Sequence, residues 1–370
     1  MKKNLLLSYF GGIRDREHGE QYFKIFRYFI PECITAVILY SVPVLIDANW
    51  IAHLKSTSAY ATLGITNTML HSVLKVAEGF SVGTIIMAGQ FNGIGRYKQT
   101  GVILVNSFWT NLCAGAVVAA LIYFGASPIC RLYHLPDSML VLAVPFLKVR
   151  AIGVFFTFVY FSLIGFLRGI KNTQVPMHIF MLGCLVFLAA DYVLIFGKLG
   201  FPALGLMGSA LASVIEYGFM SAIALIYILA TRSLQKYEIS FFPSSVSYAR
   251  VRELFVLSLP VILDKAALSG AYVWLGYCLT PMGATALASF SVIKDIERFA
   301  LLPAIAFAQV ITFLVSNDYG KKDWEGIKST TKKIIFMASI GVFAILFCCS
   351  LWPKNIIQFF DFKIGRASCR

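Results

Sequence analysis

The sequence predicts an all-α protein, a polytopic bundle of membrane-spanning helices. Of its 370 residues, 58% are hydrophobic, 15% are aromatic and only 14% are charged. That is more apolar surface than one globular core can bury in water. The apolar residues gather in runs of about 20, the length that crosses the hydrocarbon core of a bilayer. Short basic loops separate the runs, so a soluble enzyme is excluded.

Charge, proline and glycine mark the ends of nine expected spans. The expected helices cover residues 25–49, 58–89, 102–125, 150–167, 174–197, 203–230, 253–279, 284–315 and 334–352. The run at 138–147 stops at Pro145 and meets Lys148 and Arg150, so we expect a short helix lying on the outer surface. The alternative, one long fourth helix, would bury both cations in the membrane.

The net charge of +14 is interpreted as topogenic, and no nucleic-acid partner is expected, because the basic residues lie at segment ends and not along one face. Eighteen lysines and arginines fall on the N-terminal side of the spans and six on the other, which predicts a cytoplasmic N-terminus. The eight cysteines include no CxxC pair and predict neither a metal site nor a disulfide framework.

An internal repeat relates residues 59–128 to residues 284–353 at one offset of 225. The identical positions include Asn92/Asn317, Gly95/Gly320, Gly101/Gly326 and Pro128/Pro353. Six spans separate the copies, so the repeat predicts two pseudo-symmetric lobes with the same orientation in the membrane. The predicted parts are a cytoplasmic segment (1–24), a six-helix N-lobe (25–230), a cytoplasmic linker (231–252) and an incomplete C-lobe of three helices (253–363).

Four motifs stand out along the chain: LRGIKNTQVP (167–176), DYVLIFGKLGFPALGLMGSALASV (191–214), LIDANWIAHL (45–54) and AGQFNGIGRYKQ (88–99). They are similar to motifs of the multidrug and toxic-compound extrusion (MATE) family. The resemblance runs from about Phe26 to Phe362. It implies twelve helices in two six-helix lobes, a central cavity, and cation-coupled antiport of amphipathic or cationic compounds by alternating access. We therefore expect a monomeric, multi-pass protein of a prokaryotic inner membrane, with small molecules and the lipid bilayer as partners and no cofactor.

Asp191 is the strongest candidate site residue. It lies about 16 residues into its helix, roughly 24 Å from the cytoplasmic end, and Asp47 lies roughly 30 Å along the first helix. A bare carboxylate there costs about 3 kcal/mol or more unless it is protonated, binds a cation or meets a basic partner. The two acids are therefore predicted to form a cation-coupling site, and Asp191 matches the coupling aspartate of the family. The alternatives are a local polar cluster around Asp191 and an interfacial anchor at Asp47.

Weaker candidates surround this pair. Tyr192, Ser209 and Ser213 are expected near the cation site, although the small residues of the sixth span also suit close helix packing. Asp264 and Asp295 are candidates for a polar cavity in the C-lobe. Lys75 and Glu78 are expected to pair, since they lie three residues apart on one helix.

Protons are favoured over Na⁺ as the coupling ion. The family commonly has asparagine four residues before the coupling aspartate, where this chain has Phe187. A sodium site would therefore lack one oxygen ligand.

Two other functions compete with drug export. A lipid-linked precursor flippase of the same superfamily would share the two-lobe plan but should have a strongly cationic cavity. A membrane-embedded enzyme would require catalytic residues on one face, and the five histidines are scattered without partners. We expect no enzyme activity.

The last residues are expected to be foreign to the protein. Residues 364–370, IGRASCR, match the translation of a common sequencing adapter. The repeat also implies three further helices beyond residue 363. The sequence thus predicts a C-terminally truncated transporter.

Overall fold

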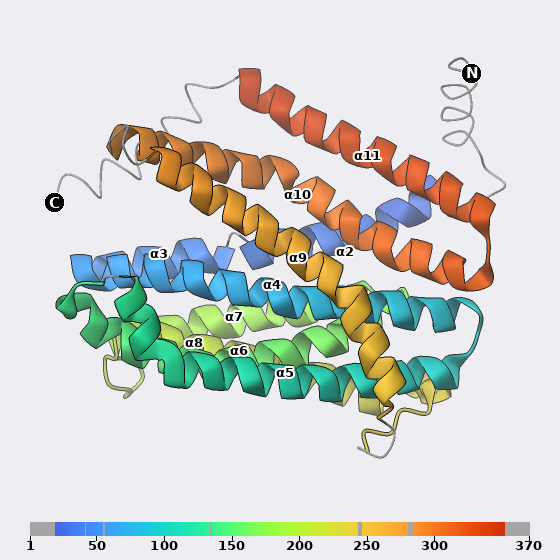
Figure 1. Cartoon of the computed structure of the whole chain (residues 1–370), viewed down its shortest axis with the longest axis horizontal. Helices are drawn as coiled ribbons and strands as arrows, with labels where there is room; N and C mark the ends of the chain where they lie inside the picture. The colour runs from blue at the N-terminus through green and yellow to red at the C-terminus, as the bar shows by residue number, and fades with distance from the viewer. Residues whose placement is uncertain are drawn as a thin grey trace. The chain divides into compact units, whose positions relative to one another are not determined.

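The computed structural model describes residues 19–40, 42–54, 56–133, 135–242, 246–279 and 284–351, and within these ranges the chain is helices joined by short loops (Figure 1). The elements are α2 (Tyr22–Tyr40), α3 (Val42–His53), α4 (Thr57–Gly93), α5 (Tyr97–Leu132), α6 (Asp137–Gly169), α7 (Gln174–Phe196), α8 (Leu206–Ala230), η1 (Arg232–Tyr237), α9 (Tyr248–Leu279), α10 (Ala284–Lys321) and α11 (Trp324–Leu351). Most of the predicted N-terminal segment and the predicted adapter segment lie outside the described residues.

Eight of the described helices, α4 to α11, are long and apolar enough to cross a membrane. The chain is therefore a multi-pass membrane protein, and the prediction of a polytopic helical bundle is confirmed. The first predicted span, 25–49, falls on α2 and α3, and the one residue between these two helices lies outside the described ones. Taken singly, α2 contains Lys24, Arg27 and Glu32, and α3 has 12 residues.

The expected surface helix at 138–147 is wrong, because it continues into the fourth span as one helix, α6, with Pro145 inside it. Neighbouring groups stabilise Lys148 and Arg150, the two cations whose burial was the reason for not expecting one long helix. The Lys148 ammonium lies 5.3 Å from the ring centroid of Tyr123, and Arg150 borders a pocket that contains carboxylates. Aromatic and acidic neighbours offset the cost of placing a cation at this depth.

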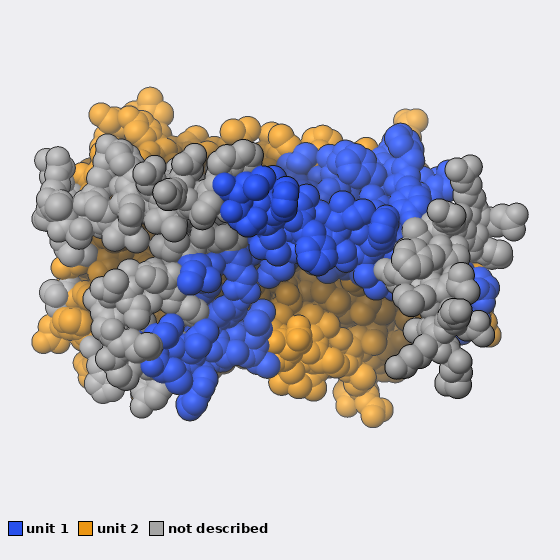
Figure 2. Space-filling model, turned by 90° about the horizontal axis from the view of Figure 1, so that it is seen from above, with its two compact units in different colours: residues 1–36, 267–311, 324–370 blue, residues 37–266, 312–323 orange. Residues whose placement is uncertain are grey.

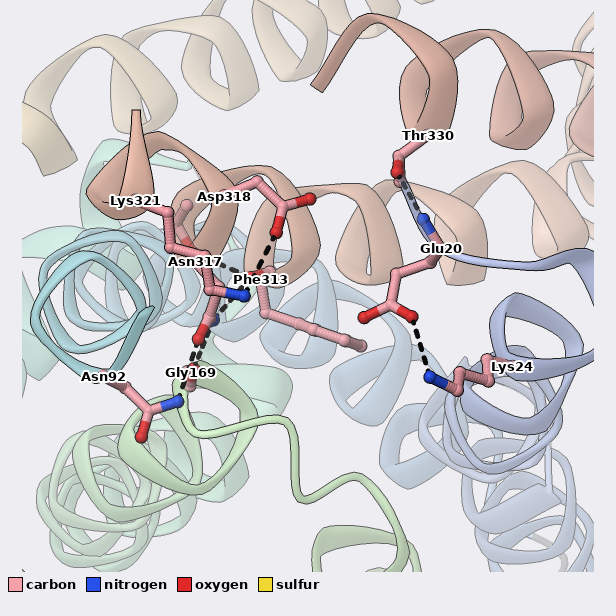
Figure 3. Close-up of polar contacts among 10 residues, drawn as sticks. Glu20, Lys24, Asn92, Gly169, Phe313, Asn317, Asp318, Lys321 and Thr330 are labelled. Atoms are coloured by element: carbon pink, nitrogen blue, oxygen red, sulfur yellow. Dashed lines mark hydrogen bonds and ion pairs between the residues drawn. The ribbon is translucent and has the colours of Figure 1, made fainter. Parts of the chain in front are cut away.

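The chain divides into two compact units, which Figure 2 colours separately. One unit comprises residues 1–36, 267–311 and 324–370. Within it, the rings of Phe29 and Phe307 stack with centroids 4.1 Å apart. The backbone N–H of Glu20 donates to the hydroxyl of Thr330 on α11 at 3.0 Å (Figure 3). Segments far apart in sequence thus meet through one aromatic pair and through the backbone of Glu20, which lies just before α2.

The other unit comprises residues 37–266 and 312–323 and is built around α6. This helix packs against α4, α5 and α8, while α7 packs against α8 and α3. The fully buried aromatic side chains of α6 are Phe146, Phe158, Tyr160 and Phe166. A helix with large buried side chains along its length is the expected centre of a bundle.

The two copies of the repeat touch within this second unit. The amide of Asn92 on α4 donates to Oδ1 of Asn317 on α10 at 2.8 Å, and the Asn317 amide donates to the carbonyl oxygen of Gly169 at 2.8 Å (Figure 3). The hydroxyl of Tyr237 in η1 donates to Oδ1 of Asn92 at 2.9 Å. Burial raises the pKa of Tyr237 to about 12, so its phenol stays protonated and remains a donor at neutral pH.

Candidate cation and substrate site

Asp191 owes its position to a tight connection between α7 and α8. Gly197 ends α7 in the left-handed conformation, with φ of +66°, and so turns the chain back. Gly208 of α8 then lies against the α7 backbone, where a Cβ atom would stand 2.6 Å from the carbonyl carbon of Leu194. These glycines belong to the motif at 191–214, and they bring α8 onto α7 one turn beyond Asp191.

The structure brings the two predicted acids together. Asp191 is fully buried, and neither of its carboxylate oxygens meets a hydrogen-bond donor among the described residues. Asp47 of α3 is also buried, and its negative charge acts on Asp191. Ser209 lies beside the Asp47 carboxylate, and Oδ1 of Asp47 has no donor within the described part of the chain. Two poorly compensated carboxyl groups therefore share one buried region.

A third acid and one base complete this cluster. Glu216 of α8 and Arg150 of α6 line the same pocket as Asp47. The charges of Glu216, Arg150 and Asp47 all act on Asp191. We call Asp47, Asp191, Glu216 and Arg150 the carboxyl cluster. Fully ionised, it carries three negative charges and one positive charge, a net charge of −2 in a region of low dielectric. Such a cluster favours the uptake of protons or other cations.

The pocket beside the cluster has a volume of about 80 Å³. Its polar lining consists of Asp47, Asn67, His71, Glu78, Arg150, Ser213, Glu216 and Tyr217. Three phenylalanines, Phe161, Phe180 and Phe187, supply apolar walls. Aromatic walls beside carboxylates are suited to an amphipathic cation.

Glu78, on the α4 side of the pocket, is already neutralised. Lys75 donates to both of its carboxylate oxygens, at 2.9 and 3.0 Å, which confirms the predicted pair. The ammonium of Lys265 on α9 adds a second ion pair at 3.3 Å. This carboxylate is therefore held by two ammonium groups, whereas those of the carboxyl cluster have one guanidinium among three.

The remaining predicted residues fall in different places. Ser209 and Ser213 face the Asp47 side of the site. Tyr192 turns away from the pocket, because it is 44% exposed and its ring lies 5.7 Å from that of Trp50. Asp264 is exposed on α9, and the side chain of Asp295 lies outside the described residues.

Sequence reasoning missed Glu216 and Arg150. A signal for Glu216 was present, since Ser209, Ser213 and Glu216 follow one another at intervals of four and three residues on one face of α8. Arg150 was assigned to the outer surface because α6 was expected to break at Pro145. Among the described residues, no three His, Cys, Asp or Glu side chains are spaced to hold a metal ion.

Comparison with protein families gives one match that covers most of the chain. The model of the family described as MatE matches residues 33–193 and 260–363. The probable multidrug resistance protein YoeA of Bacillus subtilis is 22% identical over 86% of this chain and 69% of its own length. The probable multidrug resistance protein NorM of Thermotoga maritima is 24% identical over 85% of this chain and 67% of its own length.

Solved structures show the same fold. A multidrug resistance MATE family transporter of the MOP superfamily, in an outward-facing conformation, superposes with a TM-score of 0.83 at 20% identity, over 93% of this chain and 75% of that one. A MOP superfamily transporter from Pyrococcus furiosus, whose reversed pocket polarity suggests a different function for that protein, superposes with a TM-score of 0.82 at 20% identity. The superposition covers 91% of this chain and 73% of that transporter.

Proposed function

Because the chain belongs to the MATE family of multidrug transporters, we propose that it exports amphipathic or cationic compounds in exchange for protons that bind at the carboxyl cluster. The observation that carries this proposal is the carboxylate of Asp191, fully buried among other acids and without a hydrogen-bond donor in the described structure. A group in that position is stable when it is neutral, so it holds a proton or the positive charge of a substrate.

Exchange follows from competition for the same negative charge. A proton that enters from the outer side reduces the negative charge of the cluster, which weakens its attraction for a bound organic cation and favours release of that cation. Once the site opens to the cytoplasm, loss of the proton restores the charge and a new substrate cation can bind. Alternating access of this kind needs two conformations that differ in their affinity for both ligands.

The export function is tested in everted membrane vesicles with a panel of cationic dyes and antibiotics. We expect dye uptake into the vesicles to require a pH gradient and to stop when an ionophore collapses it. Uptake that is insensitive to the gradient would contradict proton coupling.

The balance of charge distinguishes this proposal from the flippase alternative. The pocket is lined by the carboxylates of Asp47 and Glu216 and the guanidinium of Arg150, while the carboxylate of Glu78 is already neutralised by Lys75 and Lys265. A lipid-linked phosphate headgroup would require the opposite balance of charge.

Asp47 is expected to tune the site and not to carry the coupled proton alone. The hydroxyl-bearing side chain of Ser209 lies beside its carboxylate, whereas neither carboxylate oxygen of Asp191 meets a donor among the described residues. We expect Asp47→Asn to slow proton-driven efflux about two- to fivefold and to shift its pH dependence, since one like charge beside Asp191 is removed. Efflux identical to the unaltered protein across the pH range would assign Asp47 to an anchoring role.

A cytoplasmic N-terminus is part of the proposal and can be tested without transport. The loop at Lys198 precedes α8 and the one at Lys236 follows it, and both residues are exposed. Since α8 is long enough to span the membrane, the loops lie on opposite sides. We expect a single cysteine at position 198 to react with an impermeant reagent in intact cells, and one at position 236 to be protected. The reverse pattern would invert the orientation.

A further inference from the structure

A second cavity, away from the carboxyl cluster, lies between α4, α5 and α9. It is a groove of about 650 Å³, and valine, alanine, leucine, isoleucine and phenylalanine side chains make up most of its wall. Val117 of α5 and Phe255 and Leu259 of α9 line it and are still 59%, 47% and 53% exposed. All three helices are long and apolar enough to span the membrane. The groove therefore opens towards hydrocarbon and not towards water.

The polar atoms of the groove wall are already bonded within the protein. The indole N–H of Trp109 donates to the carbonyl oxygen of Phe241 at 3.0 Å, and the hydroxyl of Thr110 donates to the carbonyl oxygen of Asn106 at 2.7 Å. The other polar side chain among the described lining residues is the thiol of Cys113, a weak hydrogen-bonding group. A ligand with polar groups would lose its own hydrogen bonds to water here, so the groove suits a hydrocarbon chain.

The length of the groove matches one leaflet of a bilayer. On α9 its lining runs from Val251 to Ile262, which are about 16 Å apart at the helical rise. The hydrocarbon core of a membrane is about 30 Å thick, so the acyl chains of one leaflet extend about half of that distance. The groove is therefore as long as one acyl chain.

A cation lies where this groove reaches the start of α9. Arg252 is exposed and shares a face of α9 with the groove residue Phe255, three positions later, and no ion pair joins Arg252 to another described residue. The adjacent acid, Glu253, is paired with Arg250 at 2.8 Å. Tyr248, one turn before Arg252, is 83% exposed. Exposed aromatic and basic side chains at the start of a span are the groups that meet phospholipid headgroups.

We propose that the groove binds one acyl chain of an anionic phospholipid, and that Arg252 holds the phosphate of its headgroup where α9 begins. The bound chain lies between α5 and α9 and fastens the first half of α9 to the bundle. A zwitterionic phospholipid offers the same chains without the net negative charge, so Arg252 selects the headgroup and the groove selects the chain. This site goes beyond drug export and does not depend on it.

The test is native mass spectrometry of the delipidated, purified protein with phosphatidylglycerol or phosphatidylcholine of identical acyl chains. We expect one phosphatidylglycerol to bind at least about fivefold more tightly than phosphatidylcholine, because the guanidinium attracts the anionic headgroup. Arg252→Gln should bind the two lipids equally. The matched control is Arg232→Gln, which removes an exposed arginine of η1 from the same side of the membrane, since no span lies between η1 and α9. This control should keep the preference.

A second pair of variants tests the groove itself. Val117→Trp fills it with an indole ring and should weaken the binding of both lipids at least about fivefold. Val256→Trp is the control, because Val256 of α9 is 61% exposed but does not line the groove. If Val117→Trp does not purify as a monodisperse species, Cys113→Phe fills the same groove one turn earlier and takes its place.

Three results would each overturn the proposal. They are equal binding of the two lipids by the unaltered protein, a preference that survives in Arg252→Gln, and groove-filling variants that bind lipid as tightly as Val256→Trp does. A dimer that disappears in Val117→Trp would also overturn it, because the groove would then be a contact between two copies of the chain. Loss or absence of dye export would leave all of these binding results unchanged.

Discussion

Asp191→Asn is expected to abolish proton-driven efflux while leaving the protein inserted and abundant. Asparagine fills almost the same volume but cannot take up or release a proton, so the exchange cycle has no titrating group at its most buried position. We expect dye export driven by a pH gradient to fall by at least about tenfold, to the level of passive leak. The measurement is uptake in everted vesicles, normalised to the amount of protein in the membrane.

The same substitution, Asp191→Asn, should not lower the stability of the protein. The Asp191 carboxyl group has no hydrogen-bond donor among the described residues, so a neutral amide breaks no such bond and fixes the uncharged state that burial favours. The melting temperature of the purified variant should therefore stay the same or rise. Asp264→Asn is the matched control, since Asp264 is exposed on α9, and its export should be unchanged. Undiminished export by Asp191→Asn would exclude the coupling role.

Most of the fold could be predicted from hydropathy alone, because each apolar run that crosses a bilayer must be a helix whose backbone is internally bonded. The prediction failed at the fourth span, where a proline lies inside an apolar run. Pro145 was interpreted as a helix end, yet α6 continues through it as one helix.

The candidate site could be predicted in part. A lone carboxylate inside an apolar helix is costly, and this cost identified Asp191 and Asp47 without a structure. Glu216 satisfies the same criterion. Arg150 could not be placed, because its role depends on α6 being continuous and on which face of α6 meets α8. Long-range packing sets that face, and the order of residues along one helix does not.

The crossing of α4 and α10 provides the largest expected loss of stability. Gly93 is the last residue of α4, and a Cβ atom there would collide with the backbone carbonyl of Asn317. Gly320 of α10 is in the same situation, since its Cβ would collide with the carbonyl oxygen of Gln90. Two glycines, one on each copy of the repeat, therefore let the helix backbones touch, and the Asn92–Asn317 hydrogen bond forms only at that separation.

Gly93→Ala is consequently expected to destabilise the protein by about 1–3 kcal/mol, because backbone atoms cannot move aside as a flexible side chain can. Separating the helices would also stretch the bonds from Asn317 to Asn92 and Gly169, and leaving a buried amide unpaired adds a further cost. The measurement is the thermal midpoint in detergent, obtained from the loss of the monodisperse size-exclusion peak after heating. Gly64→Ala is the control, since Gly64 lies on the same helix, a Cβ atom there would have nothing within 4 Å, and alanine favours helix. If both variants melt at the temperature of the unaltered protein, then the contact between Gly93 and Asn317 does not hold α4 against α10.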